Sequence, residues 1–516
     1  MIPDPRWERW CVRVLVYGIA SVLVPASPGY AVGAAHRDMT TIRDSIAGPR
    51  DTSDHAVSIS VPQGRYARLV CTDFYTAVNG DWADHMALPV NSSDTLPLFA
   101  DRPDTLSISK WGILAAASAQ SIRALLADAR VAAPTTRDPL TRILGTFYQS
   151  CLVTPRDSMS PASTPASTAP APETDGGVAR CVGATQEVLG NALSRAYLRA
   201  VTTPARLARA RTLAEELRSA MEARFRAATW MSPRTKDQAL HTLSRMRFLI
   251  GTTDGEVEDD TVTLSPTDYA GNRAALQYVA YKRSLTQDEH TPKTLTHGAT
   301  PYTINALYRA NVNAVEIPAA LLHEPLFNPD SDAIENYAGL GYIMGHEMSH
   351  AFDTEGFHAN AADSAAWTEG DRAYYRGEVA KLVAEYDGFT VGGLHMSGAQ
   401  TIHENLADLG GVAAAFDVYM RYRRRHGQQP AVSRRRPSVD ASRITPAQWF
   451  FLAYATINRV KQRHANDTML LGLDGHSAYQ WRVNGTLAAM PEFARAFDCK
   501  PGDPMALTAS ARPALW

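Results

Sequence analysis

Two histidines spaced four residues apart place the strongest constraint on how this chain folds. His346 and His350 flank Glu347 in a His-Glu-x-x-His pattern. Positions i and i+4 share one face of an α-helix, so a helix directs both imidazoles at one point, as tetrahedral Zn²⁺ requires. Glu347 then lies beside the metal and can accept a proton from water. The pattern predicts a helix over residues 336–352 that binds zinc and carries a general base.

A catalytic zinc keeps three protein ligands and one open position, so the chain must supply a third ligand. Glu404 and Asp408 lie one turn apart in a second expected helix, from Ile402 to about Tyr422. Such pairs usually lie on a solvated face, but this helix is apolar on several sides, and buried acids need a partner. We expect Glu404 to bind zinc and Asp408 to accept the free N–H of a ligand histidine. Spacing alone does not exclude other carboxylates as the third zinc ligand: Asp353, Glu355, Asp363, Glu369, Glu378 and Glu385.

Several segments resemble the neprilysin and endothelin-converting-enzyme family of zinc peptidases. Residues 342–353 (YIMGHEMSHAFD) resemble the zinc helix of that family, and residues 404–411 (ENLADLGG) resemble its glutamate-ligand helix. The resemblance implies that Glu404 is the third zinc ligand and that the catalytic part is thermolysin-like. Further matching segments follow in order from about residue 65 to the C-terminus: 71–75, 79–82, 230–236, 304–319, 476–483 and 491–499.

The resemblance also implies roles for residues outside the two motifs. Asn305 and Ala306 match a segment that hydrogen-bonds the substrate backbone as an added strand. His476 matches a histidine that stabilises the oxyanion, and Arg482 matches an arginine that binds a substrate carbonyl or carboxylate. From the residues alone, an ordinary strand or turn and a surface loop remain the simpler interpretation.

The chain departs from the family between Cys151 and Cys181. Family members carry a much longer helical stretch there, whereas this chain has about thirty residues rich in Ser, Pro, Ala and Thr. That composition cannot bury a core, which predicts a flexible linker at about residues 155–178. A shortened member with a reduced helical lid implies a more open site, or a partner that covers it. His403 replaces a family glycine and points about 100° away from Glu404 on the helix.

Composition excludes some functions and indicates the compartment. The chain of 516 residues has a net charge of −2 and 45% hydrophobic residues, so nothing indicates nucleic-acid binding. Apart from Cys11, four cysteines remain, an even number that suggests two disulfides with three possible pairings in an exported protein. The family resemblance favours Cys71–Cys499 and Cys151–Cys181.

The N-terminus resembles a targeting sequence. Three arginines precede an apolar stretch from Val14 to Val24, and small residues follow. We interpret residues 1–34 as a secretory signal peptide, because the stretch is short for a membrane span. The mature protein is then secreted or periplasmic, without a stable membrane span. An uncleaved N-terminal anchor is the alternative.

The apolar pattern predicts a mainly α-helical (α+β) protein with a small sheet. Helical periodicity covers residues 105–133, 187–247 and 449–463, the last after a Thr-Pro helix start, and residues 302–315 are strand-like. After the signal peptide we expect a polar leader (35–64), a helical lid domain containing the linker (65–300) and a thermolysin-like zinc-peptidase catalytic domain (301–516).

The combined hypothesis is an exported zinc endopeptidase with one Zn²⁺ per chain. It cleaves oligopeptides, and the resemblance places the cleavage on the amino side of hydrophobic residues. One alternative is a zinc hydrolase with a single dedicated or non-peptide substrate. Another is a catalytically silent zinc-binding homologue, against which the intact Glu347 argues.

Overall fold

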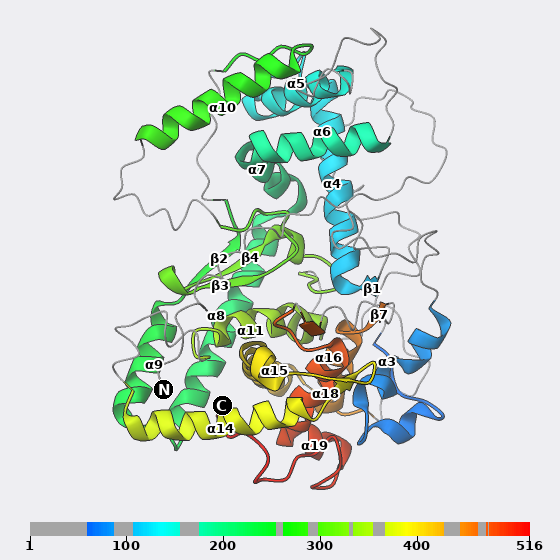
Figure 1. The fold of residues 1–516 in the computed structure, drawn as a ribbon, viewed down its shortest axis with the longest axis vertical. Coiled ribbons are helices and arrows are strands. Elements are labelled where there is room, and N and C mark those ends of the chain that lie inside the picture. Colours follow the sequence, from blue (N-terminus) through cyan, green and yellow to red (C-terminus); the bar gives the residue numbers. More distant parts are fainter. Residues whose placement is uncertain are drawn as a thin grey trace.

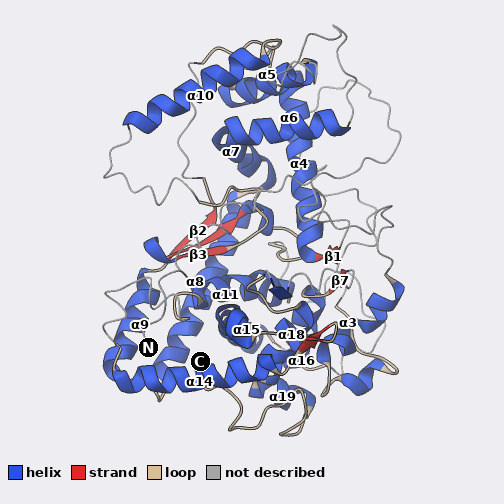
Figure 2. Ribbon diagram, in the orientation of Figure 1, coloured by secondary structure: helices blue, strands red, loops and turns tan. Residues whose placement is uncertain are grey.

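The protein is mainly α-helical, as predicted, and its few strands are short (Figure 2). The computed structural model describes residues 59–86, 107–154, 175–253, 262–286, 298–329, 334–353, 367–427, 444–462, 471–472 and 474–515. The predicted signal peptide, most of the predicted leader and most of the predicted linker lie outside the described residues.

One group of helices, the upper helical region, lies at one end of the molecule (Figure 1). A long helix, α4 (Lys110–Ala132), reaches up into it from the rest of the chain. Its own buried core gathers residues from α4, α5, α6, α7 and α10. The other four helices are α5 (Pro139–Val153), α6 (Asp175–Val188), α7 (Gly190–Val201) and α10 (Tyr269–Thr286).

Two sequence predictions in this part of the chain need correction. The predicted linker ends too late, because α6 already begins at Asp175. The helical pattern over 187–247 is not one continuous helix. It breaks before Pro204 and Pro233, which occupy the first turns of α8 (Pro204–Ala227) and α9 (Pro233–Arg245). Proline has no N–H to donate and clashes inside a helix, but it fits the first turn.

A three-stranded sheet lies below the upper helical region (Figure 1). The central strand β4 (Ala314–Pro318) is fully buried and pairs in parallel with β2 (Arg247–Gly251). On its other side β4 pairs antiparallel with β3 (Leu307–Arg309). The predicted strand over 302–315 is therefore two strands, separated by the short helix η5 (Ala310–Val312). Among the described residues β3 is an edge strand.

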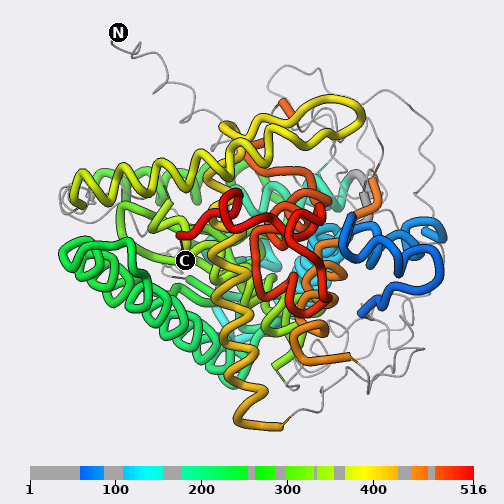
Figure 3. Tube along the Cα trace, turned by 90° about the horizontal axis from the view of Figure 1, so that it is seen from below, coloured from blue at the N-terminus to red at the C-terminus, as the bar shows by residue number. Residues whose placement is uncertain are grey.

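The remaining helices form the lower helical region around the largest core of the molecule. The helix α15 (Gly398–His426) crosses its centre, end-on in Figure 1 and lengthwise in Figure 3. It packs most closely against α11 (Tyr342–Ser349). The other helices of this region are α8 and α9, with η2 (Tyr66–Leu69), α3 (Phe74–His85), η7 (Asn336–Gly341), α14 (Glu369–Asp387), α16 (Pro446–Ile457), α18 (Tyr479–Ala488) and α19 (Pro491–Phe497). The short helix η6 (Ala319–Leu321) packs against α4, α7 and β2 instead.

The helix α16 was predicted correctly at its start but not at its end. Thr445 and Gln448 form a reciprocal capping box at the start of α16, as the Thr-Pro signal indicated. The same helix ends at Ile457, not at residue 463, because the next residues form β7 (Val460–Gln462), which pairs with β1 (Ser107–Ser109). A second small hairpin joins β5 (Thr390–Val391) to β6 (Leu394–His395).

Two disulfides have the pairing that the family resemblance favours. Cys71 and Cys499 join the segment before α3 to the segment after α19, with Cα atoms 5.4 Å apart. Cys151 and Cys181 join α5 to α6, with Cα atoms 5.7 Å apart. Among the described residues, no helix is long and apolar enough to cross a membrane.

Candidate metal centre

Two glycines allow the helices that carry the predicted ligands to touch. Gly345 on α11 faces Gly411 on α15, and a Cβ added at Gly411 would lie 2.5 Å from the backbone nitrogen of His346. Any larger side chain at this crossing would push the helices apart. The close approach brings Glu404, two turns earlier on α15, beside the histidines.

The three predicted zinc ligands converge. The Nε2 atoms of His346 and His350 lie 3.2 Å apart. Glu404 Oε2 lies 3.0 Å from Nε2 of His346, and Glu404 Oε1 lies 3.8 Å from Nε2 of His350. His350 closes α11 as its C-terminal capping residue, so the helix predicted to reach residue 352 ends at Ser349. The first part of the predicted helix is the π-helical turn η7, which leads directly into α11.

This set of donors fits a tetrahedral zinc ion. Ligands at the usual zinc distances lie about 3.3–3.6 Å from one another, close to the observed separations. Glu404 Oε2 is buried, yet it accepts no well-aligned hydrogen bond from the described residues. The three donor atoms all lie within 4.8 Å of one another. Two neutral imidazoles and a carboxylate are a zinc donor set.

The electrostatics of the centre favour a positive charge. Burial disfavours the charged form of His346, but Asp408 and Glu404 outweigh it and raise the pKa of the imidazole to about 9. Burial likewise opposes the charged form of Glu404, but its interactions with His346 and His476 hold the pKa of this carboxyl far below its usual range. A site that attracts protons this strongly also attracts a divalent cation.

A carboxylate oxygen contacts Nδ1 of each predicted ligand histidine. Nδ1 of His346 lies 2.8 Å from Oδ1 of Asp408, as the helix spacing predicted. Nδ1 of His350 lies 2.8 Å from Oδ2 of Asp353. Such contacts fix the tautomer that leaves Nε2 free for a metal. Asp353 was only an alternative ligand in the sequence analysis; its spacing of three residues from His350 was the signal for this supporting position.

Asp408 is fully buried and its charge is balanced by Arg482. The guanidinium donates from Nε to Oδ2 at 2.8 Å and from Nη2 to Oδ1 at 2.7 Å. Burial opposes ionisation of Asp408, but Arg482 holds the pKa of this carboxyl well below its usual range. Arg482 was expected to bind substrate, and in the structure its guanidinium hydrogen-bonds Asp408 and Tyr342.

Glu347 and His476 border the ligand cluster. Glu347 is buried, and burial raises the pKa of its carboxyl above the ordinary value, which suits a group that takes up a proton. His476 precedes α18, and its Nε2 lies 3.0 Å from Glu404 Oε2. Its Nδ1 lies 2.7 Å from Oδ1 of Asp474. The sequence analysis missed Asp474; an acid two residues before His476 was the available signal.

The predicted substrate residues lie at the start of the edge strand. Asn305 is exposed and Ala306 is buried, directly before β3. Both β3 and β4 contact the zinc helix α11. Among the described residues, the outer edge of β3 has no neighbouring strand.

The other candidate ligands lie apart from the cluster. Glu369, Glu378 and Glu385 belong to α14, whereas Glu355 and Asp363 lie outside the described residues. His403 Nδ1 lies 3.9 Å from Asp353 Oδ2 and is not among the converging donors.

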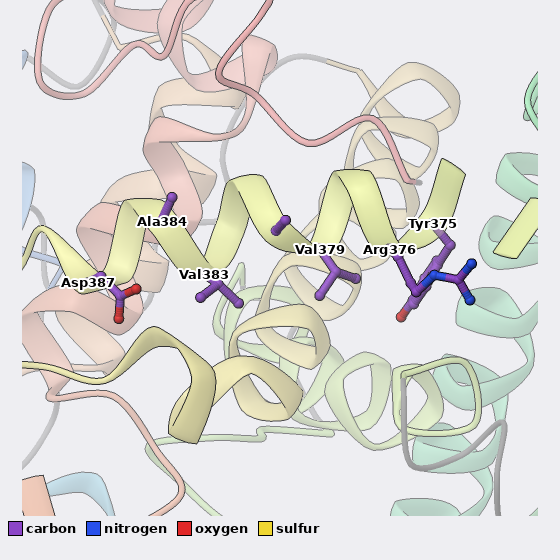
Figure 4. Close-up of a pocket in the computed structure, with 7 residues that line it drawn as sticks. Tyr375, Arg376, Val379, Val383, Ala384 and Asp387 are labelled. Atoms are coloured by element: carbon purple, nitrogen blue, oxygen red, sulfur yellow. The ribbon is translucent and has the colours of Figure 1, made fainter. Parts of the chain in front are cut away.

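A surface pocket of about 350 Å³ is also separate from the ligand cluster. It opens along α14, and none of its described lining residues belongs to the cluster (Figure 4). Those lining residues are Tyr375, Arg376, Val379, Ala380, Val383, Ala384 and Asp387.

Known proteins share this fold and these motifs. Neprilysin-3 of Drosophila melanogaster is 28% identical over 334 residues, which are 63% of this chain and 42% of that protein. Endothelin-converting enzyme-like 1 of Homo sapiens is 27% identical over 333 residues, again 63% of this chain and 42% of that protein. The chain therefore spans less than half the length of these curated relatives.

Solved structures show the same likeness. Zinc metalloprotease Zmp1 of Mycobacterium tuberculosis, in complex with inhibitor, matches with a TM-score of 0.55 and 28% identity over 66% of this chain and 51% of that one. PepO from Lactobacillus rhamnosis HN001 matches in fold, with a TM-score of 0.50, 23% identity and the same two coverages.

Two family models match the chain and together cover more than half of it. Both are described as peptidase family M13, one over residues 305–512 and one over residues 167–253. The first contains the converging ligands and their supporting residues. The chain therefore belongs to peptidase family M13, the family of neprilysin and the endothelin-converting enzymes that its motifs predicted.

Proposed function

We propose that this protein is a zinc-dependent endopeptidase. The observation that carries the proposal is the convergence of His346, His350 and Glu404 from two helices, with buried Glu347 beside them. A binding protein needs the three ligands, but only a hydrolase needs a general base at that place. Membership of a peptidase family supports the same conclusion.

The three ligands would hold one Zn²⁺ per chain. When bound, zinc supplies Lewis-acid chemistry: it polarises the scissile carbonyl and makes water a better nucleophile at neutral pH. Asp408 and Asp353 keep Nδ1 of each histidine occupied, so that Nε2 faces the metal.

Glu347 moves the proton in this proposal. Its carboxylate accepts a proton from the attacking water and later passes it to the leaving amine. Because burial raises its pKa, the carboxyl holds that proton more readily than an exposed glutamate does.

Three further groups would act on the substrate. His476, oriented by Asp474, donates to the oxygen that becomes negative as the carbonyl is attacked. Asn305 and Ala306 hydrogen-bond the substrate backbone along the edge of β3. Arg482 contributes through Asp408, and by family resemblance it also faces a substrate carbonyl or carboxylate.

The finer specificity and location follow the resemblance. We propose cleavage on the amino side of hydrophobic residues in oligopeptides by an exported enzyme. The two disulfides support export, because disulfides persist in oxidising compartments.

One observation favours a second candidate. The match spans only 42% of the first curated relative, and by family resemblance the stretch between Cys151 and Cys181 is shorter here than in other members. A zinc hydrolase with one dedicated substrate, or an enzyme whose site a partner completes, would fit that shorter stretch.

The test is cleavage of a mixed peptide library by the purified protein and by Glu347→Gln, with bound zinc quantified in both. Cleavage by the parent alone, at equal zinc content, is the expected result. Zinc without cleavage of any peptide by the parent would reject the general endopeptidase and favour the dedicated substrate, the partner or a silent binding role. Equal cleavage by both proteins would reject Glu347 as the base.

A further inference from the structure

We propose that Tyr342 is a positioning residue of the metal centre, which holds Asp408 in place behind His346. The inference deepens the proposed function and rests on the zinc site described there. In the sequence analysis, Tyr342 had no role beyond being the first residue of the segment that resembles the zinc helix of the family.

Asp408 is the meeting point of four hydrogen bonds. Its Oδ1 accepts from the Tyr342 hydroxyl at 2.6 Å and from Nη2 of Arg482 at 2.7 Å, and lies 2.8 Å from Nδ1 of His346. Its Oδ2 accepts from Nε of Arg482. The carboxylate has no exposed surface, so water cannot replace a lost partner, and every partner helps to fix its position.

Tyr342 and Arg482 contact Asp408 from different helices. Tyr342 and His346 lie four residues apart on the zinc helix, so they present side chains on the same face. The side chains of Tyr342 and His346 both contact Oδ1 of Asp408 from α11. Arg482 contacts the same oxygen from α18. The Tyr342 hydroxyl therefore ties Asp408, which comes from α15, directly to the helix whose histidine Asp408 orients.

Tyr342 is itself held firmly. Its ring packs edge-on against Tyr454, with centroids 4.9 Å apart, and Nζ of Lys110 lies 5.5 Å from its ring centroid. Nη2 of Arg482 lies 3.1 Å from its hydroxyl oxygen, so the oxygen accepts one bond while its hydrogen goes to Asp408. Burial first of all raises the pKa of this phenol well above its ordinary value, which keeps the hydroxyl proton in place.

The test removes only the hydroxyl. Tyr342→Phe keeps the ring and its packing, and we expect the zinc dissociation constant, measured by competition with a chelator, to rise about 10- to 100-fold. The matched control is Tyr197→Phe, which removes a buried hydroxyl bonded to Ser118 in the upper helical region. The control should lose some thermal stability and keep the zinc affinity of the parent.

A double-mutant cycle identifies the residue through which Tyr342 acts. If it acts through Asp408, then Tyr342→Phe weakens zinc binding much less in an Asp408→Asn background than in the parent. An unchanged zinc affinity in Tyr342→Phe, or an effect that persists undiminished beside Asp408→Asn, would overturn the inference. A parent that binds zinc without cleaving peptides would refute the peptidase alone, whereas a parent that binds no zinc would refute both.

Discussion

The lower and upper helical regions differ in the kinds of side chain that they bury. Around α11 and α15, several buried charged groups form a hydrogen-bonded network, in which Asp408 alone joins Tyr342, His346 and Arg482. The upper helical region buries apolar side chains together with uncharged polar ones such as Ser118, Ser150 and Thr185. It also exposes a stripe on α10, where Tyr278, Tyr281 and Leu285 are 60%, 59% and 66% exposed.

The difference shows which contacts the chemistry depends on. The ligands and their supports come from α11, α15 and the segment around α18, which are distant in sequence and pack in one core. The upper helical region contributes apolar packing and a disulfide. The converging donors therefore lie entirely within the lower helical region.

The largest expected effect is the loss of zinc affinity when a ligand in the lower helical region is removed. Glu404→Ala removes one of three ligands, so zinc affinity should fall by more than about 100-fold, beyond the loss typical of an outer-shell partner. Zinc retained after dialysis against a chelator is the measurement. Zinc content equal to that of the parent would mean that another residue completes the site.

Removing the disulfide of the upper helical region should lower the stability of the protein and leave its zinc affinity unchanged. Cys151 and Cys181 are separated by 30 positions in the sequence, and replacing both with serine should reduce the free energy of unfolding by about 3–4 kcal/mol on a chain-entropy basis. Denaturant unfolding gives that energy, and a zinc titration gives the affinity. A weaker zinc affinity in this variant would contradict the separation of the two regions.

A buried carboxyl outside the metal centre should make stability depend on pH. Neither carboxylate oxygen of Glu385 has a hydrogen-bond partner among the described residues, and burial raises the pKa of this carboxyl to about 8. Because the folded state holds the proton more tightly than the unfolded state, its contribution to stability is complete below about pH 4 and is lost as pH rises through 8. The loss between pH 7 and pH 8 should be about 1 kcal/mol.

Glu385→Gln is the control for this pH dependence, because the amide does not ionise. Urea unfolding of both proteins across that range should show a smaller loss with rising pH in the variant. The same slope in both proteins would show that Glu385 is solvated in solution.

The smallest expected effect lies on the exposed stripe of α10. Leu285→Ala should change the free energy of unfolding by less than about 0.5 kcal/mol, as is usual for surface positions. Leu193→Ala, in the buried core of the same region, should cost about 2–5 kcal/mol. If the two variants unfold alike, the α10 face is covered in solution, for instance by another molecule.

Local spacing predicted that the two histidines meet, whereas the choice of Glu404 among several carboxylates came from family resemblance. His346 and His350 share a helix face by geometry alone, and Glu404 and Asp408 repeat the same spacing on α15. Helix starts at Thr445 and the mainly helical class also follow from short-range rules. The disulfide pairing came from family resemblance, since four cysteines allow three pairings.

Long-range contacts could not be predicted from the chain. Nothing in the sequence places Arg482 on Asp408 or the Tyr342 hydroxyl on the same oxygen, because these residues meet only after α11, α15 and α18 have packed. The strand β7 was missed for the same reason: its partner β1 lies about 350 residues earlier, as the pairing of Ser109 with Val460 shows. The helical pattern over 449–463 described local preference, and tertiary pairing overrode it.

The central claim is that one zinc ion lies between His346, His350 and Glu404. Anomalous diffraction recorded at the zinc absorption edge, from crystals of the full chain grown with zinc, tests it directly. We expect a single peak about 2.0–2.2 Å from Nε2 of both histidines and from a carboxylate oxygen of Glu404. A peak on other residues, or none at these three in zinc-saturated crystals, would contradict the account.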